Sequence, residues 1–273
     1  MSDTITPARV GASRTPWPAG APKLEIAGLG LSFGDLAVLE DLSLHAHEGE
    51  FVSILGPSGS GKSTTFSALT GSATPTTGEI LIDGAPLATQ RSQFAFMPQK
   101  DALLPWRRII DNLTLGLEVQ GLRRAEARRR VTPLLETFGL AGFERSYPFE
   151  LSGGMRQRAA LLRTVVQERN VMLLDEPFGA LDALTRAEMQ QWIEGVWERF
   201  RWTVLLITHD VREALFLSDR IYVYSRRPAT VVATVEVPLP RPRTLDILTD
   251  PTFASLEREL LATLLEPPPT ARA

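Results

Sequence analysis

Residues 53–64 read Ser-Ile-Leu-Gly-Pro-Ser-Gly-Ser-Gly-Lys-Ser-Thr. From Gly56 onward they match the pattern G-x-x-x-x-G-K-[ST] of the phosphate-binding loop, or P-loop. The flanks agree, because the apolar residues 51–55 predict a buried strand and residues 64–69 can begin a helix. A phosphate loop needs this order of strand, loop and helix. A flexible Gly/Ser linker is the alternative, but such linkers seldom place Gly-Lys-Ser directly after an apolar strand.

Each part of the loop has a chemical task. Its glycines let the backbone bend, so that successive N–H groups and the N-terminus of the following helix face phosphate oxygens. We expect Lys62 to reach the β- and γ-phosphates of a nucleotide, and the Ser63 hydroxyl to ligate Mg²⁺. The predicted phosphate-binding residues are Gly56, Pro57, Ser58, Gly59, Ser60, Gly61, Lys62, Ser63 and Thr64.

The composition is that of an ordinary globular protein. The chain has 273 residues, long enough for one or two domains, with 44% hydrophobic and 22% charged residues. The net charge of −3 argues against a general nucleic-acid binder, and the lack of cysteine excludes disulfides and thiolate chemistry. No apolar run approaches the roughly 18 residues of a membrane span, and the N-terminus has no apolar signal core. We therefore expect any membrane role to come through a partner.

Apolar patterns along the chain predict a mixed α/β fold. Residues 23–50 and 78–97 contain short alternating segments and an Asp83-Gly84 turn, which predict a small antiparallel layer. Further along, short apolar strands alternate with helices, and this alternation predicts a mainly parallel sheet. The predicted strands of this later part are 171–174, 204–207 and 221–224, and its predicted helices are 183–200 and 211–217.

The remaining segments complete the expected organisation. Residues 1–22 are rich in Pro, Ala, Gly, Ser and Thr, and predict a disordered tail. Residues 100–166 have a helical pattern, and predict a helical subdomain inserted into a folded domain of residues 23–237. Residues 238–273 predict a Pro-rich linker, a last helix over 252–265 and a tail.

An arginine-rich run occupies residues 123–130 within the helical pattern. A solvated helix face is the interpretation that we favour. Contact with anionic lipid headgroups is the alternative.

A second pair of chemically important residues follows the predicted strand 171–174. Asp175 ends this strand and can hold the Mg²⁺ shell, as a Walker B acid does. Glu176 comes next and can act as the general base for an attacking water. An Asp-Glu pair alone is a weak signal, but downstream of a P-loop it predicts nucleotide hydrolysis.

Residues 151–158 read Leu-Ser-Gly-Gly-Met-Arg-Gln-Arg. With this motif the chain resembles the ATP-binding cassette (ABC) family of transport ATPases, whose signature is LSGGQ. Met155 replaces the usual Gln, which is a mild departure. Ser152, Gly153 and Gly154 offer a hydroxyl, free N–H groups and a helix N-terminus to an anion. The resemblance implies that these three residues close the P-loop of a second subunit, and a plain helix N-cap is the alternative.

The resemblance covers residues 23–237 and implies roles for further residues. Gln99 matches the Q-loop glutamine, Asp182 the D-loop, and His209 the switch histidine that contacts the γ-phosphate. Phe33 matches the A-loop aromatic that stacks on adenine, where the family usually has Tyr, and packing in a strand core is the alternative. The implied ligands are ATP and Mg²⁺, the metal held by Ser63, Gln99 and Asp175.

Residues 99–108 read Gln-Lys-Asp-Ala-Leu-Leu-Pro-Trp-Arg-Arg and are similar to the importer group for nitrate, sulfonate and taurine. That group also imports pyrimidine precursors of thiamine. The resemblance implies a peripheral subunit on the cytoplasmic face of the inner membrane. Its partners are a transmembrane permease, a second ATPase subunit in a homodimer and, indirectly, a periplasmic or lipoprotein substrate-binding protein, with no nucleic acid. Leu103, Leu104 and Trp106 then form the groove for the permease, and ordinary packing is the alternative.

The expected fold is therefore α/β: a P-loop NTPase core with a mainly parallel sheet, an antiparallel β layer and an inserted α-helical subdomain. The expected function is ATP hydrolysis that energises uptake of a small solute through a separate permease, with Glu176 and His209 as catalytic residues. A soluble ABC ATPase acting on nucleic acid or ribosomes is the alternative function. It would show a basic surface, an insertion or a tandem cassette, and the sequence has none of these. A regulator that does not hydrolyse is disfavoured by the intact Glu176 and His209.

Overall fold

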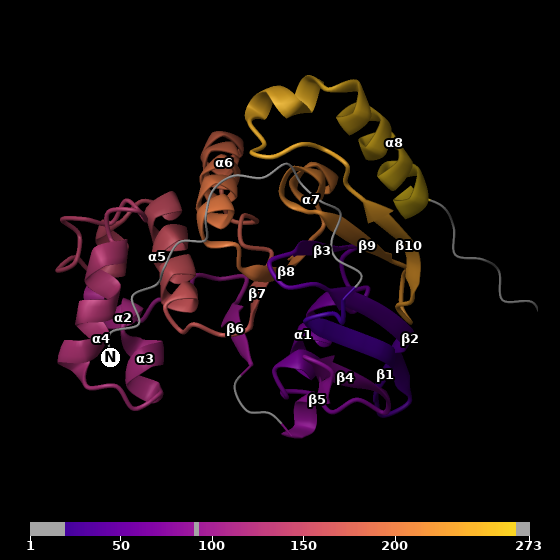
Figure 1. Cartoon of the computed structure of the whole chain (residues 1–273), viewed down its shortest axis with the longest axis horizontal. Coiled ribbons are helices and arrows are strands. Elements are labelled where there is room, and N and C mark those ends of the chain that lie inside the picture. The colour runs from indigo at the N-terminus through magenta and orange to yellow at the C-terminus, as the bar shows by residue number, and fades with distance from the viewer. Residues whose placement is uncertain (1–19, 90–92, 266–273) are drawn as a thin grey trace, which may run out of the picture.

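The structure, a computed structural model, describes residues 20–89 and 93–265. The predicted disorder of residues 1–22 falls almost wholly outside this part of the chain. Within it, no helix is long and apolar enough to cross a membrane. The described residues form two sheets with helices packed around them (Figure 1).

A six-stranded sheet carries the P-loop strand near its centre, in the order β10-β9-β3-β8-β7-β6. All neighbours are parallel except β10, which runs antiparallel to β9 at one edge. The mainly parallel sheet is therefore confirmed. Parallel strands end at the same edge, so the residues that follow β3, β6, β7 and β8 come together there. The bounds are β3 (Phe51–Leu55), β6 (Phe94–Met97), β7 (Val171–Asp175), β8 (Thr203–Thr208), β9 (Arg220–Tyr224) and β10 (Val231–Glu236).

A four-stranded antiparallel sheet lies beside it, in the order β2-β1-β4-β5 (Figure 1). Asp83 and Gly84 join β4 to β5 with φ of 51° and 74°, as a tight hairpin turn requires. The expectation that residues 94–97 belong to this layer is wrong. That segment is β6, which pairs in parallel register with the buried strand β7. The bounds are β1 (Leu24–Phe33), β2 (Leu36–Ala46), β4 (Thr77–Ile82) and β5 (Ala85–Pro86).

The parallel sheet is covered on both faces, because successive strand residues point in opposite directions. Val52 and Ile54 pack with the antiparallel sheet and with helix α1. Phe51 packs with helix α6, and Leu55 with helices α7 and α8. Figure 1 shows α6, α7 and α8 on the side of the sheet away from α1. The bounds are α1 (Lys62–Leu69), α6 (Ala183–Phe200), α7 (Val211–Leu217) and α8 (Pro251–Leu265).

The remaining helices gather at one side of the molecule, away from the antiparallel sheet (Figure 1). They begin later than the sequence predicted, because residues 100–108 contain no helix. Arg163 instead donates to the carbonyl oxygens of Asp101 and Ala102, at 2.6 Å each, and fixes these residues as a loop. These helices are α2 (Ile109–Leu113), α3 (Leu115–Val119), α4 (Arg124–Val131) and α5 (Gly153–Val165). Short 3₁₀ helices cover Leu87–Thr89, Thr132–Leu134, Pro148–Glu150 and Leu245–Thr249.

Strand β10 was missed by the sequence analysis. Its side chains alternate between half-buried and exposed, as on a sheet edge with one solvated face. The signal was present as Val231, Ala233 and Val235 at period two, but the segment contains few large apolar residues.

Residues 237–243, here called the C-terminal strap, are packed against the domain although the sequence predicts a linker there. Val237 donates its N–H to Asp219 O at 2.8 Å, and Val237 and Leu239 are buried. Arg241 lies over the Trp197 ring, 4.1 Å from its centroid, and forms ion pairs with Glu194 and Asp219. The strap thus connects β9 and α6 to the last helix.

Arg243 ends the strap and is only 1% exposed. Its guanidinium donates to five carbonyl oxygens, three of them on residues around the C-terminal end of α7. A buried helix end needs donors for its last carbonyl groups, and Arg243 supplies them. The acceptors are Leu215, Phe216, Ser218, Val237 and Leu239, at 2.7 to 3.5 Å.

Candidate functional site

The P-loop runs from the end of β3 to the start of α1, as predicted. Gly61 precedes α1 with φ of 119°, a region that L side chains rarely adopt. A Cβ atom there would lie 2.9 Å from Leu39 Cδ2, and one at Gly56 would lie 3.1 Å from Tyr224 Cβ. Gly61 is therefore needed both for its backbone conformation and because a side chain has no room there. Gly56 is needed because a side chain has no room.

Lys62 lies in the first turn of α1 and points back along the loop. Its ammonium donates to Gly56 O at 2.8 Å and to Pro57 O at 3.0 Å. Burial lowers the pKa of Lys62, and the nearby carboxylates of Glu176 and Asp175 counteract part of that effect. The cation is thus held over the mouth of the loop by two carbonyl oxygens that an anionic ligand can replace.

Ser63 and Asp175 meet across the loop, as the sequence predicts for residues around one metal ion. Ser63 Oγ donates to Asp175 Oδ1 at 3.4 Å. Burial raises the pKa of Asp175, while the Ser63 hydrogen bond acts in the opposite direction. A hydroxyl and a carboxylate at one point are hard oxygen donors of the kind that Mg²⁺ prefers.

Glu176 follows β7, and its side chain meets residues that follow the neighbouring strands β6 and β8. Its Oε2 accepts a hydrogen bond from Gln99 Nε2 at 3.0 Å, and lies 3.2 Å from His209 Nδ1. The backbone of Glu176 has φ of 44°, and its N–H donates to Ile207 O at 2.9 Å. The residue is held in an unusual conformation at a functional position. Here "the polar edge" denotes the set Lys62, Ser63, Gln99, Asp175, Glu176 and His209.

One residue of the loop environment was missed by the sequence analysis. Arg227, in the turn between β9 and β10, donates to Gly59 O from Nε at 3.3 Å and from Nη2 at 2.9 Å. Arginine is common in turns that follow apolar strands, so nothing in the sequence alone places Arg227 beside the P-loop.

The predicted signature residues lie apart from the P-loop. Ser152 caps α5, its Oγ accepting from Met155 N at 3.3 Å. Gly154 faces Thr185, since a Cβ there would lie 3.2 Å from Thr185 Cγ2. In the described part of the chain, the Ser152–Gly154 turn makes no hydrogen bond to the 56–64 loop. Ser152 therefore acts as a helix N-cap within the chain, and its predicted contact with the P-loop of a second subunit stays a prediction.

Asp182 and Phe33 occupy the rim of the fold. Asp182 caps α6 by accepting from Thr185 N at 3.1 Å, and the hydrogen bonds around Thr185 lower the pKa of its carboxyl. Phe33 ends β1 with 57% of its surface exposed, so the core-packing alternative for this ring is wrong.

The predicted permease groove is only partly a surface. Leu103 is buried in the core and Leu104 is half-buried, whereas Trp106 is 72% exposed. The backbone here is fixed, because Leu104 N donates to Asn112 Oδ1 at 2.6 Å. Among the three, Trp106 is the residue with a largely exposed side chain, and Leu103 is packed in the core as the alternative expects.

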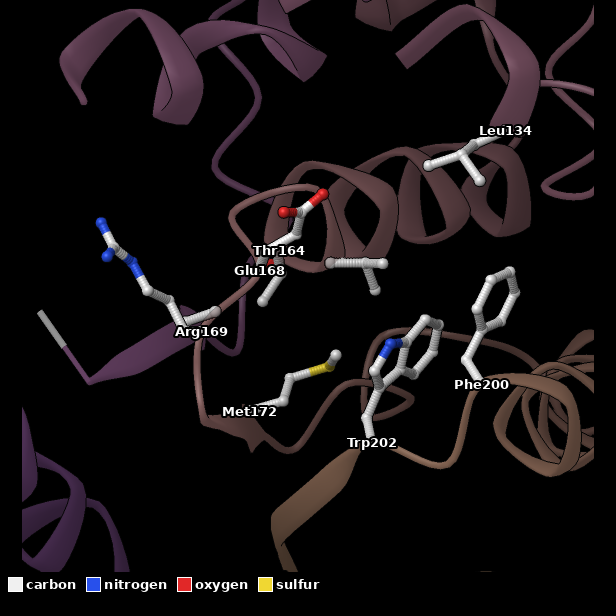
Figure 2. A pocket seen from close by; sticks show the side chains of 9 residues that line it. Leu134, Thr164, Glu168, Arg169, Met172, Phe200 and Trp202 are labelled. Atoms are coloured by element: carbon white, nitrogen blue, oxygen red, sulfur yellow. The ribbon is translucent and has the colours of Figure 1, made fainter. Parts of the chain in front are cut away.

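A hollow of about 310 Å³ is lined by residues outside the polar edge (Figure 2). Phe200 and Trp202 stack at 4.9 Å between ring centroids and form one wall, with Met172 near them (Figure 2). The hollow contains none of the predicted site residues.

The fold and the polar edge agree with comparisons to known proteins. Residues 39–179 match the ABC transporter family. The aliphatic sulfonates import ATP-binding protein SsuB 2 of Pseudomonas aeruginosa is 44% identical over 90% of this chain and 85% of its own. The formylaminopyrimidine import ATP-binding protein ThiZ of Halalkalibacterium halodurans is 41% identical over 84% and 90%.

A solved structure with the same fold is dimeric MJ0796, described as a bacterial ABC transporter cassette. It is 29% identical and covers 80% of this chain and all of its own, with a TM-score of 0.68. Another structure of that cassette is described as a post-hydrolysis state with ADP and Pi. The names of these relatives give no support to the nucleic-acid alternative. The chain therefore belongs to the ABC transporter family, as one of its ATP-hydrolysing subunits.

Proposed function

We propose that the protein hydrolyses MgATP at the polar edge to energise a separate permease that imports a small organic solute. The observation that carries this proposal is the convergence of Lys62, Asp175 and Glu176 beside the P-loop. The relatives named for sulfonates and for formylaminopyrimidine support a solute of one of these two classes. The subunit then works on the cytoplasmic face of the inner membrane.

The triphosphate binds along the loop, with Lys62 turned from its two carbonyl acceptors to the β- and γ-phosphates. Ser63, Asp175 and the amide oxygen of Gln99 are the residues that would hold Mg²⁺, and the ion would supply charge neutralisation between phosphates. In the described part of the chain, no three His, Cys, Asp or Glu residues form a metal cluster. This agrees with an ion that is bound partly by the nucleotide.

Glu176 takes the proton of the attacking water. Gln99 donates to its Oε2, and His209 faces the same oxygen, so the carboxylate is oriented before any water arrives. His209 and Lys62 then stabilise negative charge that develops on the γ-phosphate.

A second subunit completes the site. Ser152, Gly153 and Gly154 head α5 with free N–H groups and make no hydrogen bond to their own loop among the described residues. Such a helix start binds anions. The dimeric arrangement of the related cassette MJ0796 supports the pairing of two copies.

The permease contacts the loop at residues 100–108, where Trp106 is exposed on a backbone fixed by Arg163 and Asn112. A rigid aromatic side chain on a fixed loop is a good anchor for a partner helix.

Nucleotide binding tests the core of the proposal. Lys62→Ala removes the cation over the loop, and its MgATP affinity by calorimetry is expected to fall at least about tenfold. Lys23→Ala is the matched control, because Lys23 pairs with Asp83 in the antiparallel sheet. An affinity of Lys62→Ala within about threefold of the unmodified chain would contradict the assignment.

The solute class is tested in cells. Deletion of the gene is expected to abolish growth on alkanesulfonates as sulfur source while growth on sulfate continues. Normal growth on sulfonates together with a new requirement for thiamine would move the solute to the pyrimidine class.

A further inference from the structure

One side chain joins two loops of the site within a single subunit. Arg186 lies in the first turn of α6, just after the loop that contains Asp182. Its Nη2 donates to Leu181 O in that loop at 3.1 Å. Its Nη1 forms an ion pair with Asp210 Oδ2, on the turn after β8, at 3.5 Å. The planar guanidinium therefore spans the two segments with separate nitrogen atoms.

Asp210 is firmly attached to the backbone that carries His209. Its Oδ1 caps α7 by accepting from Arg212 N at 2.9 Å and from Glu213 N at 3.2 Å. Its own N–H donates to Thr208 Oγ1 at 3.0 Å. His209 stands between these anchored residues, so a displacement of Asp210 displaces the imidazole that faces Glu176.

Glu213 does not replace Asp210 as the partner of Arg186. It is 4% exposed, and burial together with the Asp210 charge raises its pKa well above the ordinary value. The ion pair of Arg186 is formed with Asp210, and among the described residues Arg186 forms none with Glu213. Glu213, Arg186 and Asp210 line a small hollow together with Glu176 and His209.

We propose that Arg186 is a positioning residue that holds the Asp182 loop and the His209 turn in a fixed relation. This inference rests on the proposed roles of Asp182 and His209 at the nucleotide. The loop and the turn then move as one unit when two subunits meet around ATP. Arg186 acts through these neighbours and, among the described residues, makes no hydrogen bond or ion pair with the P-loop.

If Arg186 is a positioning residue, its substitution lowers ATP turnover and leaves ATP binding unchanged. Arg186→Met is expected to lower kcat about tenfold, because a small misplacement of a catalytic group is costly. MgATP affinity of the single subunit is expected to stay within about twofold, because the P-loop is untouched. Arg186→Lys keeps the charge toward Asp210 but lacks the fork that also reaches Leu181 O. It is expected to keep the fold and to recover only part of kcat.

A double-mutant cycle tests whether Arg186 works through Asp210. Asp210→Asn keeps an oxygen for the α7 cap and removes the charge. If the pair acts as a unit, kcat of Arg186→Met combined with Asp210→Asn lies within about twofold of the slower single variant. The full-length chain is used throughout, at a temperature where circular dichroism shows every variant folded.

Arg199→Met is the matched control, because Arg199 lies in the last turn of the same helix, far along α6 from Asp182. Its kcat is expected to match that of the unmodified chain. Two results would overturn the inference: kcat of Arg186→Met and of Arg186→Lys equal to that of the control, or losses that multiply in the double variant. An unmodified chain without ATPase activity would instead reject the proposed function.

Discussion

The polar edge and the C-terminal strap are both built from charged side chains, yet their hydrogen bonding differs. At the polar edge, Lys62 is held by two loop carbonyl oxygens, and Asp175 accepts a long hydrogen bond of 3.4 Å from the Ser63 hydroxyl. In the strap, Arg243 is buried and directs its guanidinium at five carbonyl oxygens, and Arg241 pairs with two carboxylates. The first arrangement leaves capacity for a ligand, whereas the second directs most of its donors at acceptors within the chain.

The difference separates charge that acts on a substrate from charge that stabilises the fold. A buried cation is costly unless it is well hydrogen-bonded, and in the strap the Arg243 guanidinium donates to five carbonyl oxygens. The polar edge keeps part of its charge unmatched, with burial raising the pKa of Asp175 and lowering that of Lys62. Such perturbed groups are typical of functional sites.

The sharpest test of this contrast is Glu176→Gln at the polar edge. Gln keeps the shape and still hydrogen-bonds water, but it cannot take a proton, so turnover is expected to fall about 10²- to 10⁴-fold. ATP affinity and the thermal unfolding midpoint are expected to stay unchanged. Steady-state ATPase assays, calorimetry and thermal scans measure turnover, ATP affinity and the unfolding midpoint, respectively. Glu188→Gln, on an exposed position of α6, is the control. Near-normal turnover of Glu176→Gln would show that another group is the base.

The opposite result is expected in the strap. Arg243→Met leaves several buried carbonyl groups without their donor, and this is expected to cost about 3 kcal/mol or more of stability. Urea denaturation measures the loss, with the exposed Arg258→Met as control. MgATP affinity of the fraction that stays folded should be normal. An unchanged unfolding midpoint would mean that water satisfies these carbonyl groups.

A smaller effect is expected at Phe33, which belongs to neither group. Phe33→Ala removes a ring face worth about 1 kcal/mol of stacking, so ATP affinity by calorimetry should fall about fivefold. Phe33→Tyr should bind as the unmodified chain does. The ring is largely exposed, so stability should not change. Phe149→Ala, another exposed ring, serves as control, and equal affinities for both alanine variants would remove Phe33 from the adenine site.

The strand-loop-helix unit and the parallel sheet were predictable because each rests on a local pattern. The P-loop has fixed spacing, and β7 and β8 are short apolar runs. The resemblance to the ABC family also identified the side chains that meet at Glu176, and they lie together because residues after parallel strands share an edge.

What sequence reasoning missed depends on contacts between distant segments. Arg243 stands in a Pro-rich stretch with no local pattern, and its five acceptors become close only after α7 and β10 have folded. Leu103 resembles Trp106 in hydrophobicity, and only the packed helices bury one and expose the other. Arg227 reaches Gly59 from a turn that lies 168 residues along the chain.

The strap has a genetic consequence. Every motif of nucleotide chemistry, from Gly56 to His209, lies before residue 237. A reading frame that stops after β10 would therefore still encode a complete set of motifs, yet the end of α7 would lack the Arg243 guanidinium. Such an allele would be read as intact from its motifs, although its product would lack the donor for the last carbonyl groups of α7.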